Sequence, residues 1–249
     1  MDKPTLLITG ASRGIGAATA VLAAQRGYAV CVNYVRDGVA AQKVVDEIAD
    51  LGGSAIAVQA DVAVESDVMR LFETMDQKLG SLTALVNNAG IVEQQMRVDQ
   101  IDLARLQRIF ATNVFGSLLC AREAIKRMST KHGGAGGAIV NLSSGAAKYG
   151  AAGEYVDYAA SKGAIDTLTI GLACEVATEG IRVNAVRPGF IYTDFHASGG
   201  EPDRVNRVKE LVPMKRGGQP SEIAHAILWL LSDEASYITG TIVDVAGGR

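Results

Sequence analysis

The chain has 249 residues, of which 48% are hydrophobic, 20% are charged and only 5% are aromatic, a composition typical of one globular α/β domain. Its 24 basic and 27 acidic side chains give a formal net charge of -3, so there is no basic excess to neutralise the phosphates of a nucleic acid. No run approaches the roughly 18 apolar residues that a membrane span needs, and residues 1–4 lead into a strand-like segment without the apolar region of a signal peptide. We therefore expect no nucleic-acid partner, no membrane partner and a cytoplasmic location.

Short apolar, β-branched runs alternate along the chain with longer stretches of helical period. This alternation predicts a parallel sheet with crossover helices, in one domain that spans residues 1–249. Seven strands are predicted, at residues 6–9, 29–34, 55–60, 82–87, 138–142, 182–187 and 241–245. Two polar residues are predicted to cap helices: Asp37 before residues 39–51 and Ser221 before residues 222–231.

One connection is much longer than the others. Residues 188–219 are rich in glycine, proline and charge, and a stretch of that length in a compact domain is more often functional than idle. We interpret residues 190–215 as a substrate lid. The glycine-rich run 133–137 lies between a predicted helix and the fifth strand, where a turn is needed, so we interpret it as a loop.

The cysteines and histidines indicate neither disulfides nor a metal site. The cysteines are far apart, without a CxxC pair, and we expect all three to be small buried residues: Cys31, Cys120 and Cys174. No two histidines have the spacing of metal ligands. His225 is expected on an ordinary helix, His132 lies elsewhere in the chain, and His196 falls in the lid, where it could touch substrate.

A glycine-rich turn follows the first predicted strand. Residues 9–16 read Thr-Gly-Ala-Ser-Arg-Gly-Ile-Gly and lead directly into a helical pattern. Glycine lets the backbone approach a pyrophosphate, and the free N–H groups of a helix start favour its negative charge. The spacing differs from the commoner Gly-x-Gly-x2-Gly fingerprint, so a simple tight turn is the alternative, but the place at the first strand–helix junction favours a phosphate-binding turn.

Tyr158 and Lys162 are the strongest catalytic candidates. They lie four residues apart in a helical pattern (155–178), so their side chains share one face. A nearby ammonium is expected to stabilise the phenolate and to lower the pKa of Tyr158, which could then exchange a proton with an alcohol or a carbonyl. An ordinary surface pair is the alternative. Tyr155 also shares this face but lacks the i, i+4 relation to Lys162, so it is interpreted as pocket lining or core.

Ser143 and Ser144 directly follow the fifth strand, where ligands gather at the carboxyl ends of parallel strands. A serine hydroxyl there could donate to an oxygen as negative charge develops. The two serines point to opposite faces if the strand continues, so the residues alone leave the choice open.

Together these motifs resemble the short-chain dehydrogenase/reductase family over essentially the whole chain. Besides the glycine turn, Ser144 and Tyr158-x3-Lys162, the resemblance rests on Asp61-Val62, Asn87-Asn88-Ala89-Gly90, Asn113, Pro188-Gly189 with Thr193, and Tyr237-Ile238-Thr239-Gly240. It implies a doubly wound Rossmann fold, with helices on both faces of the seven-stranded parallel sheet. It further implies an oxidoreductase that transfers a hydride between a nicotinamide and a carbonyl or secondary alcohol.

The resemblance also assigns roles to single residues. Tyr158 would be the general acid/base, and Ser144, favoured over Ser143 by the family pattern, would orient the substrate oxygen. Lys162 would tune Tyr158 and hold the nicotinamide ribose, and Asn113 would retain a water of a proton relay. The cofactor-binding residues implied are Gly10, Ser12, Arg13, Gly14, Ile15, Gly16, Tyr34, Arg36, Asp61, Val62, Asn88, Ala89, Gly90, Pro188, Gly189, Ile191 and Thr193.

The end of the second strand favours NADP(H), with NAD(H) as the alternative. NAD enzymes usually carry Asp or Glu there, whereas this chain has Tyr34. Arg13 and Arg36 could form charge-assisted hydrogen bonds with a 2′-phosphate. Both arginines could equally be solvated surface charges, and Asp37 weakens the argument.

The substrate is less well specified. Predicted pocket walls come from residues 91–95, 145–155 and the lid, with Glu93, Tyr155 and Phe190 as substrate-binding residues. Lys148 and Glu154 are further polar candidates, and Ile91, Val92 and Tyr149 further apolar ones. The chain resembles both glucose 1-dehydrogenase-like and 3-oxoacyl-carrier-protein-reductase-like members.

We favour a small sugar, polyol or ketone over an acyl thioester. An acidic carrier protein would need a basic patch near the entrance, and only three scattered arginines are present there: Arg97, Arg105 and Arg108. A regulator that binds a dinucleotide without catalysing a reaction is the alternative that is not an enzyme, because fold does not imply function. The complete catalytic set argues against that rival.

A homotetramer is expected, mainly from the resemblance. The last strand (241–245) would be an apolar sheet edge, which natural proteins cover. The preceding helix (223–231) carries more apolar surface than one sheet face should absorb, at Ile227, Trp229, Leu230 and Leu231. Pairing across a two-fold axis would cover both, and coverage within one chain is the alternative.

Overall fold

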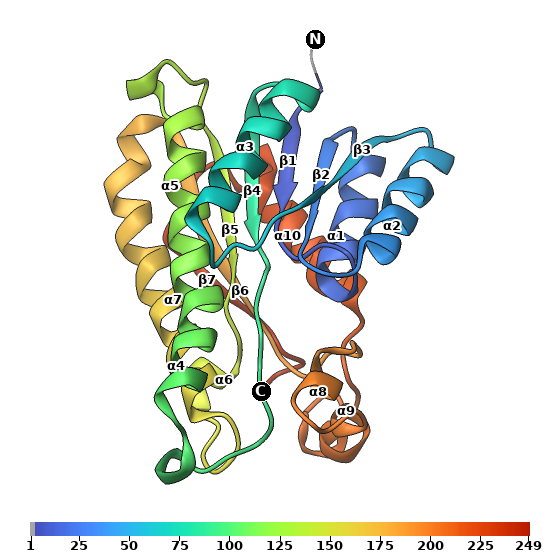
Figure 1. Ribbon diagram of the computed structural model, residues 1–249, viewed down its shortest axis with the longest axis vertical. Helices are drawn as coiled ribbons and strands as arrows, with labels where there is room; N and C mark the ends of the chain where they lie inside the picture. Colours follow the sequence, from blue (N-terminus) through green and yellow to red (C-terminus); the bar gives the residue numbers. More distant parts are fainter. Residues whose placement is uncertain (1–2) are drawn as a thin grey trace.

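The computed structural model describes residues 3–249, which form one seven-stranded sheet (Figure 1). All strands are parallel, in the order β3-β2-β1-β4-β5-β6-β7. The strands are β1 (Thr5–Ile8), β2 (Ala29–Tyr34), β3 (Ser54–Gln59), β4 (Leu82–Asn87), β5 (Gly137–Leu142), β6 (Ile181–Pro188) and β7 (Ile242–Val245). The predicted seven-stranded doubly wound sheet is confirmed, with each strand within about two residues of its expected position.

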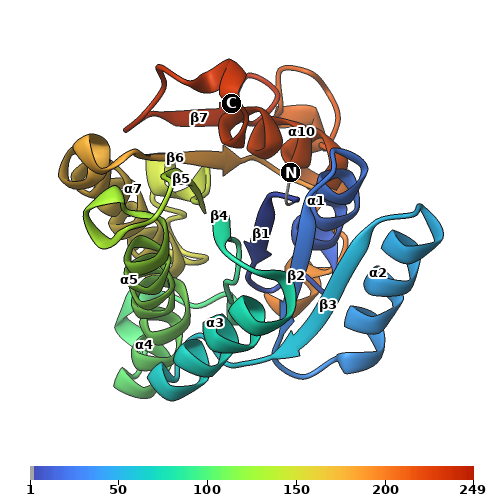
Figure 2. The same ribbon diagram turned by 90° about the horizontal axis from the view of Figure 1, so that it is seen from above.

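Helices cover both faces of the sheet (Figure 2). One layer packs on a core of β1, β2 and β5 residues and contains α1 (Gly14–Gln25), α2 (Gly38–Asp50) and α10 (Pro220–Leu231). The other contains α3 (Glu65–Leu79), α4 (Leu103–Phe110), α5 (Gly116–Met128) and α7 (Val156–Val176). The strand order reverses direction between β1 and β4, and such a switch point leaves a crevice for ligands at the carboxyl ends of the strands.

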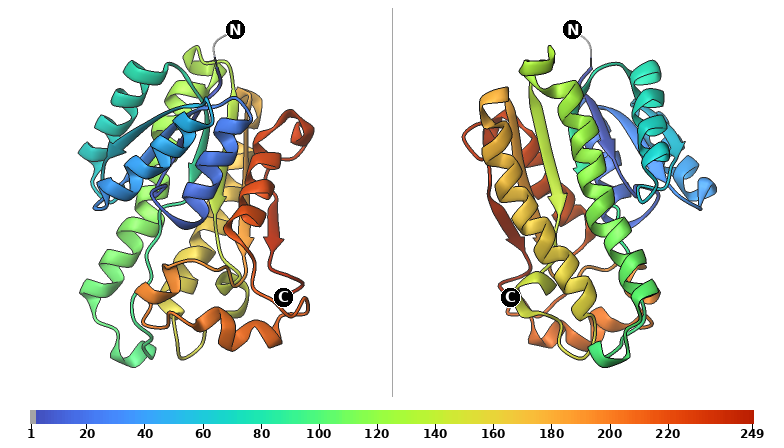
Figure 3. Two further views of the ribbon diagram at one scale, coloured as in Figure 1. Left: turned by 90° about the vertical axis from the view of Figure 1, so that its right-hand side faces the viewer. Right: turned by 60° about the vertical axis from the view of Figure 1, so that its left-hand side comes forward.

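Short elements gather at that end of the sheet (Figure 3). Three short helices lie there: α6 (Ala146–Tyr149), α8 (Phe195–Ser198) and α9 (Arg204–Val208). The remaining short turns are η1 (Val98–Gln100), η2 (Ala111–Phe115), η3 (Thr130–His132), η4 (Ala177–Glu179), η5 (Lys209–Leu211) and η6 (Asp233–Ala235). Residues 188–219 thus contain α8, α9 and η5, joined by irregular segments.

One of the two predicted helix caps is wrong. Asp37 caps α2 as expected, since its Oδ1 accepts from Ala40 N at 2.9 Å. Ser221 lies inside α10, whose cap is Gln219, because Pro220 fits the first helical position and starts the helix earlier. Glu222 completes this cap by accepting from Gln219 N at 2.8 Å.

Two further expectations about burial need correction. Cys31 and Cys120 are buried, but Cys174 is exposed, because the helical period of α7 turns it away from its buried neighbour Ala173. α10 is also absorbed within the chain. Its Ile227 and Leu230 are fully buried against the first helical layer, and only Trp229 remains partly exposed, at 37%.

No helix within residues 3–249 combines the length and apolar character that crossing a membrane requires.

Candidate active site

The glycine turn between β1 and α1 packs tightly against the segment that follows β4. Gly10 and Gly14 have φ of +62° and +58°, which side chains rarely adopt. A Cβ on Gly10 would lie 3.0 Å from Ala89 Cα, and one on Gly16 only 2.6 Å from Asn88 Nδ2. Glycine is therefore required here by the protein's own packing, and no side chain caps the start of α1.

Thr9 and Asn88 join these two segments by hydrogen bonds. Thr9 Oγ1 accepts from the backbone N of Asn88 and of Ala89, both at 3.0 Å. Asn88 Nδ2 donates to Thr9 O at 2.8 Å and to Gly10 O at 2.9 Å. Of the predicted cofactor-binding residues, Asn88 therefore also holds the shape of the turn.

Asn33, which the sequence reasoning missed, braces the same turn from the other side. It is fully buried at the end of β2, and its Oδ1 accepts from Gly10 N at 3.1 Å. Its Nδ2 donates to Ala60 O at 3.0 Å and so ties β2 to the end of β3. An amide in the otherwise apolar run of β2 was the available signal.

The two arginines predicted to bind the 2′-phosphate of NADP(H) are accessible to solvent. Arg13 and Arg36 are both exposed, and neither forms an ion pair with any residue from 3 to 249. The Tyr34 hydroxyl would lie 3.2 Å from a Cβ on Gly38, so Tyr34 leans over the start of α2. β2 ends at Tyr34 and contains no Asp or Glu.

Other predicted cofactor residues surround the same crevice. Asp61 Oδ1 accepts from Ala63 N at 2.9 Å, which fixes the turn after β3, and Val62 is buried. Thr193 lies shortly after β6, and a Cβ placed on Gly14 would be 3.3 Å from Thr193 Cγ2. The segment after β6 therefore reaches across to the glycine turn.

α7 places Tyr158 and Lys162 one turn apart. Lys162 Nζ lies 5.8 Å from the Tyr158 ring centroid and donates to Leu142 O at 2.6 Å. Burial raises the pKa of Tyr158 to about 12, and a side-chain hydrogen bond with Ser144 acts to lower it. The expected lowering by Lys162 is therefore wrong for this structure, because desolvation of the phenol dominates.

The two serines after β5 have different surroundings. Ser144 Oγ accepts from Ala146 N at 3.1 Å, and its hydroxyl is near enough to Tyr158 to act on the pKa of the phenol, which it lowers. Ser143 is buried, and its hydroxyl donates to Lys162 O at 3.3 Å. The geometry thus associates Ser144 with the phenol and Ser143 with the backbone of α7.

Asn113 lies in a π-helical turn, Ala111–Phe115, between α4 and α5. It is fully buried, and its Nδ2 donates to Ile91 O and to Ser161 Oγ, each at 3.0 Å. Ser161 Oγ in turn donates to Tyr158 O at 2.7 Å. A Cβ on Gly90 would lie 3.5 Å from both Asn113 Oδ1 and Lys162 Nζ, so these groups meet around Gly90. Such π-turns often occur at functional sites.

A buried ion pair, which the sequence did not predict, is bonded to the backbone of Tyr158. Arg105 Nε donates to Asp157 Oδ2 at 2.6 Å, with only 4% and 1% of the two side chains exposed. Asp157 Oδ1 accepts from Tyr158 N at 2.9 Å. The pair therefore links α4 directly to the backbone of the tyrosine.

The predicted substrate residues have protein partners of their own. Both carboxylate oxygens of Glu93 are bonded by Arg108, at 2.7 and 3.0 Å. Tyr155 is buried and donates through its hydroxyl to Gly199 O at 3.0 Å, which ties the start of α7 to the end of α8. Phe190 is partly buried, with its ring centroid 6.5 Å from that of His196. Burial lowers the pKa of His196, and the nearby Arg204 charge adds to this.

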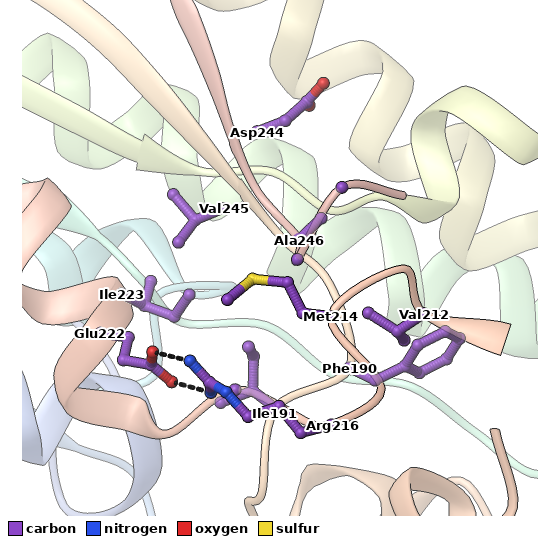
Figure 4. A pocket seen from close by; sticks show the side chains of 13 residues that line it. Phe190, Ile191, Val212, Met214, Arg216, Glu222, Ile223, Asp244, Val245 and Ala246 are labelled. Atoms are coloured by element: carbon purple, nitrogen blue, oxygen red, sulfur yellow. Dashed lines mark hydrogen bonds and ion pairs between the residues drawn. The ribbon is translucent and has the colours of Figure 1, made fainter. Parts of the chain in front are cut away.

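A cavity of about 300 Å³ opens beside this site, between the lid segment, the start of α10 and the end of β7 (Figure 4). Phe190, Val212 and Met214 are among its apolar lining residues. Arg216 and Glu222 form an ion pair at 2.6 Å on one side of it. Tyr158 does not line it. Within residues 3–249 no cluster of acidic, histidine or cysteine side chains is suited to hold a metal ion.

A doubly wound sheet with a glycine turn at its first strand–helix junction, and a Ser–Tyr–Lys group beside it, defines a Rossmann-fold oxidoreductase. The family model described as Enoyl-(Acyl carrier protein) reductase matches residues 10–249. The chain belongs to the short-chain dehydrogenase/reductase family, whose members bind a nicotinamide dinucleotide.

Three relatives illustrate this membership. An uncharacterized oxidoreductase of Escherichia coli, YgfF, is 60% identical, with 98% of each chain covered. A 3-oxoacyl-[acyl-carrier-protein] reductase of Synechocystis is 40% identical over 97% of this chain and 95% of its own. The crystal structure of 3-ketoacyl-(acyl-carrier-protein) reductase from Brucella melitensis complexed with NADH has a TM-score of 0.92 at 33% identity, covering 100% of this chain and 98% of that one.

Proposed function

We propose that the protein is an NADP(H)-preferring oxidoreductase that interconverts a small carbonyl compound, such as a sugar, polyol or ketone, with its secondary alcohol. The observation that carries the proposal is the grouping of Ser144, directly after β5, with Tyr158 and Lys162 on α7, where Lys162 Nζ lies 5.8 Å from the Tyr158 ring centroid. A spectrophotometric screen of carbonyl compounds and alcohols at the nicotinamide absorbance tests it. Turnover would also dispose of the regulator alternative.

The residues of the crevice fit a nicotinamide dinucleotide. The glycines at 10, 14 and 16 leave no side chain between the turn and the open start of α1, where a pyrophosphate is favoured. Bound there, the nicotinamide supplies the hydride in reduction or accepts it in oxidation. Lys162 lies within the same crevice, where its ammonium can hold a ribose hydroxyl.

The chain itself handles the proton. Because the pKa of Tyr158 is raised to about 12, the phenol holds its proton at neutral pH and can give it to a carbonyl oxygen. Ser144 donates to the same oxygen as negative charge develops. In oxidation the phenolate must form first, which the burial of the phenol opposes. Asn113 and Ser161 keep α7 in register with the loop at Gly90, and a water held by Asn113 completes the proton relay.

The preference for NADP(H) rests on Arg13 and Arg36. Both guanidinium groups are exposed without an ion-pair partner in residues 3–249, and no acid at the end of β2 opposes a phosphate. Thermal-shift titrations with NADP and with NAD rank the two cofactors directly, because at equal concentration the ligand with the lower Kd stabilises the folded state more.

A 3-oxoacyl thioester on a carrier protein is the second candidate, favoured by the names of several relatives. Charge speaks against it. Of the three arginines near the entrance, Arg105 is buried in its ion pair, and Arg97 and Arg108 are neutralised by Asp99 and Glu93. Comparing 3-oxoacyl-carrier protein with small ketones under identical conditions decides between the two substrate classes.

Three further expectations remain proposals. Residues 190–215 act as a substrate lid, fastened by Tyr155 and Gly199. The chain assembles as a homotetramer, supported by the exposed apolar face of Phe115, Leu118 and Ile170 on the second helical layer. Light scattering tests this, since a mass near 26.0 kDa would mean a monomer. The cytoplasmic location is tested by fractionation.

A further inference from the structure

Arg249 is held between two aromatic rings at the mouth of the site. Its guanidinium carbon lies 4.9 Å from the Phe190 ring centroid and 5.1 Å from that of Tyr149. Its Nη1 is buried and has no hydrogen-bond partner within residues 3–249. A guanidinium that stacks on aromatic rings keeps its N–H groups in its own plane, so an acceptor can reach those of Arg249 that are not buried.

This lack of an acceptor sets Arg249 apart from the other arginines that are not exposed. In the described part of the chain, each of those six has a carboxylate or carbonyl acceptor. They are Arg105, Arg122, Arg127, Arg182, Arg187 and Arg204. A buried donor without an acceptor is costly, so an external acceptor would be bound with a clear gain in free energy.

The two rings belong to the two walls of the proposed substrate site. A Cβ on Gly145, the residue after Ser144, would collide with the Tyr149 hydroxyl. Phe190 follows Pro188 and Gly189 on the opposite wall. Gly145 N donates to Pro188 O at 3.0 Å and joins the walls.

A row of rings leads from Phe190 to the catalytic tyrosine. The centroids are 6.5 Å apart for Phe190 and His196, 6.3 Å for His196 and Phe195, and 5.6 Å for Phe195 and Tyr158. These ring contacts therefore connect the phenylalanine that stacks on Arg249 with Tyr158.

The neighbouring charges do not neutralise Arg249. Asp244 is engaged by Lys148 at 2.7 Å and by Arg187 at 3.5 Å. Glu154 and Glu201 are both bonded by Arg204, on the other side of Phe190. Within residues 3–249, none of these three carboxylates is paired with Arg249.

We propose that Arg249 binds an anionic group, a carboxylate or a phosphate, at the end of the substrate remote from the reacting carbon. The proposal rests on the proposed function and narrows its substrates to carbonyl or hydroxy compounds that carry such a group. A planar guanidinium pairs with either oxyanion through two parallel hydrogen bonds. The stacking on Tyr149 and Phe190 holds it ready for that contact, which reduces the ordering required on binding.

The test uses matched pairs of aldehydes that differ only in the anion. 4-Carboxybenzaldehyde is compared with methyl 4-formylbenzoate, and glyceraldehyde 3-phosphate with glyceraldehyde, as kcat/KM at fixed NADPH. Charge-assisted hydrogen bonds are worth about 10- to 100-fold in such a ratio. We expect a preference of that size for one anionic member, and the pair that shows it tells carboxylate from phosphate.

Variants assign the preference to the residue. Arg249→Gln is expected to abolish it, and Arg249→Lys to retain part of it, because an ammonium lacks the two-pronged geometry. Arg26→Gln, which removes an exposed positive charge at the end of α1, is the control and should keep the full preference. Circular dichroism verifies that each variant is folded.

The outcomes separate this inference from the proposed function. Equal rates for charged and neutral members in the wild type, or a preference that survives Arg249→Gln, overturn the anion site and leave the proposed function standing. If neither member of any pair is reduced, calorimetric titration of benzoate and of inorganic phosphate into the NADP-loaded protein decides. Binding that is at least about tenfold weaker in Arg249→Gln supports the site, and equal or absent binding overturns it.

Discussion

Removing the guanidinium of Arg105 should destabilise the protein strongly. Arg105→Met would leave the Asp157 carboxylate, whose side chain is only 1% exposed, with the single donor Tyr158 N at 2.9 Å. It would also leave Gln94 O without the 2.6 Å bond from Arg105 Nη1. Breaking a buried ion pair in this way costs about 3 to 5 kcal/mol. Urea unfolding at one fixed protein concentration measures the loss, and a loss below about 1 kcal/mol would refute the reasoning.

The double variant Arg105→Met/Asp157→Leu separates stability from positioning. Replacing both charges with apolar groups removes the uncompensated carboxylate, so most of the stability should return. The bond from Tyr158 N to Asp157 is still missing, so the tyrosine is no longer held in place. We therefore expect a stable protein with a reduced kcat and a KM within about twofold of the wild type, since a misplaced acid affects the transition state and leaves substrate binding intact. A double variant with wild-type kcat would show that the pair serves the fold alone.

Three further predictions address the site. Tyr158→Phe should lower kcat by roughly 100-fold or more and leave the cofactor affinity, measured by fluorescence titration, nearly unchanged. Lys162→Ala should lower both kcat and cofactor affinity. Full activity of Tyr158→Phe would contradict the assignment. Replacing Arg13 and Arg36 by Ala should weaken NADP(H) more than NAD(H), by about 10- to 150-fold for each contact, and equal losses would show that no phosphate is read there. Burial lowers the pKa of Lys162 from 10.5 to about 8, so between these pH values the unfolded chain binds a proton that the folded protein has released, and folded-state stability rises with pH. Urea unfolding should show this rise, at most about 1.4 kcal/mol per pH unit, in the wild type and not in Lys162→Met.

Features that depend on neighbouring residues could be predicted from the sequence. The bounds of β2 and β4 were correct to the residue, because buried parallel strands are short apolar runs bounded by turns. The glycine turn and the shared face of Tyr158 and Lys162 are likewise local, since each follows from spacing within one or two turns of helix. The Asp37 cap belongs to the same class, because it needs only the three residues that follow.

Features that depend on distant partners could not be predicted. Asn33 appears in the sequence only as a polar residue in a strand, and its role arises because the sheet brings Gly10 and Ala60 to its two ends. Arg105 was noted only as one of three scattered arginines near the entrance, since nothing near it in the chain reveals Asp157, 52 residues away. The error about the pKa of Tyr158 has the same origin. The spacing to Lys162 was correct, but the pKa depends on how much water reaches the phenol and on whether the ammonium is bonded elsewhere, here to Leu142 O. Sequence spacing can therefore identify the pair of residues, but their proton affinities are set by packing.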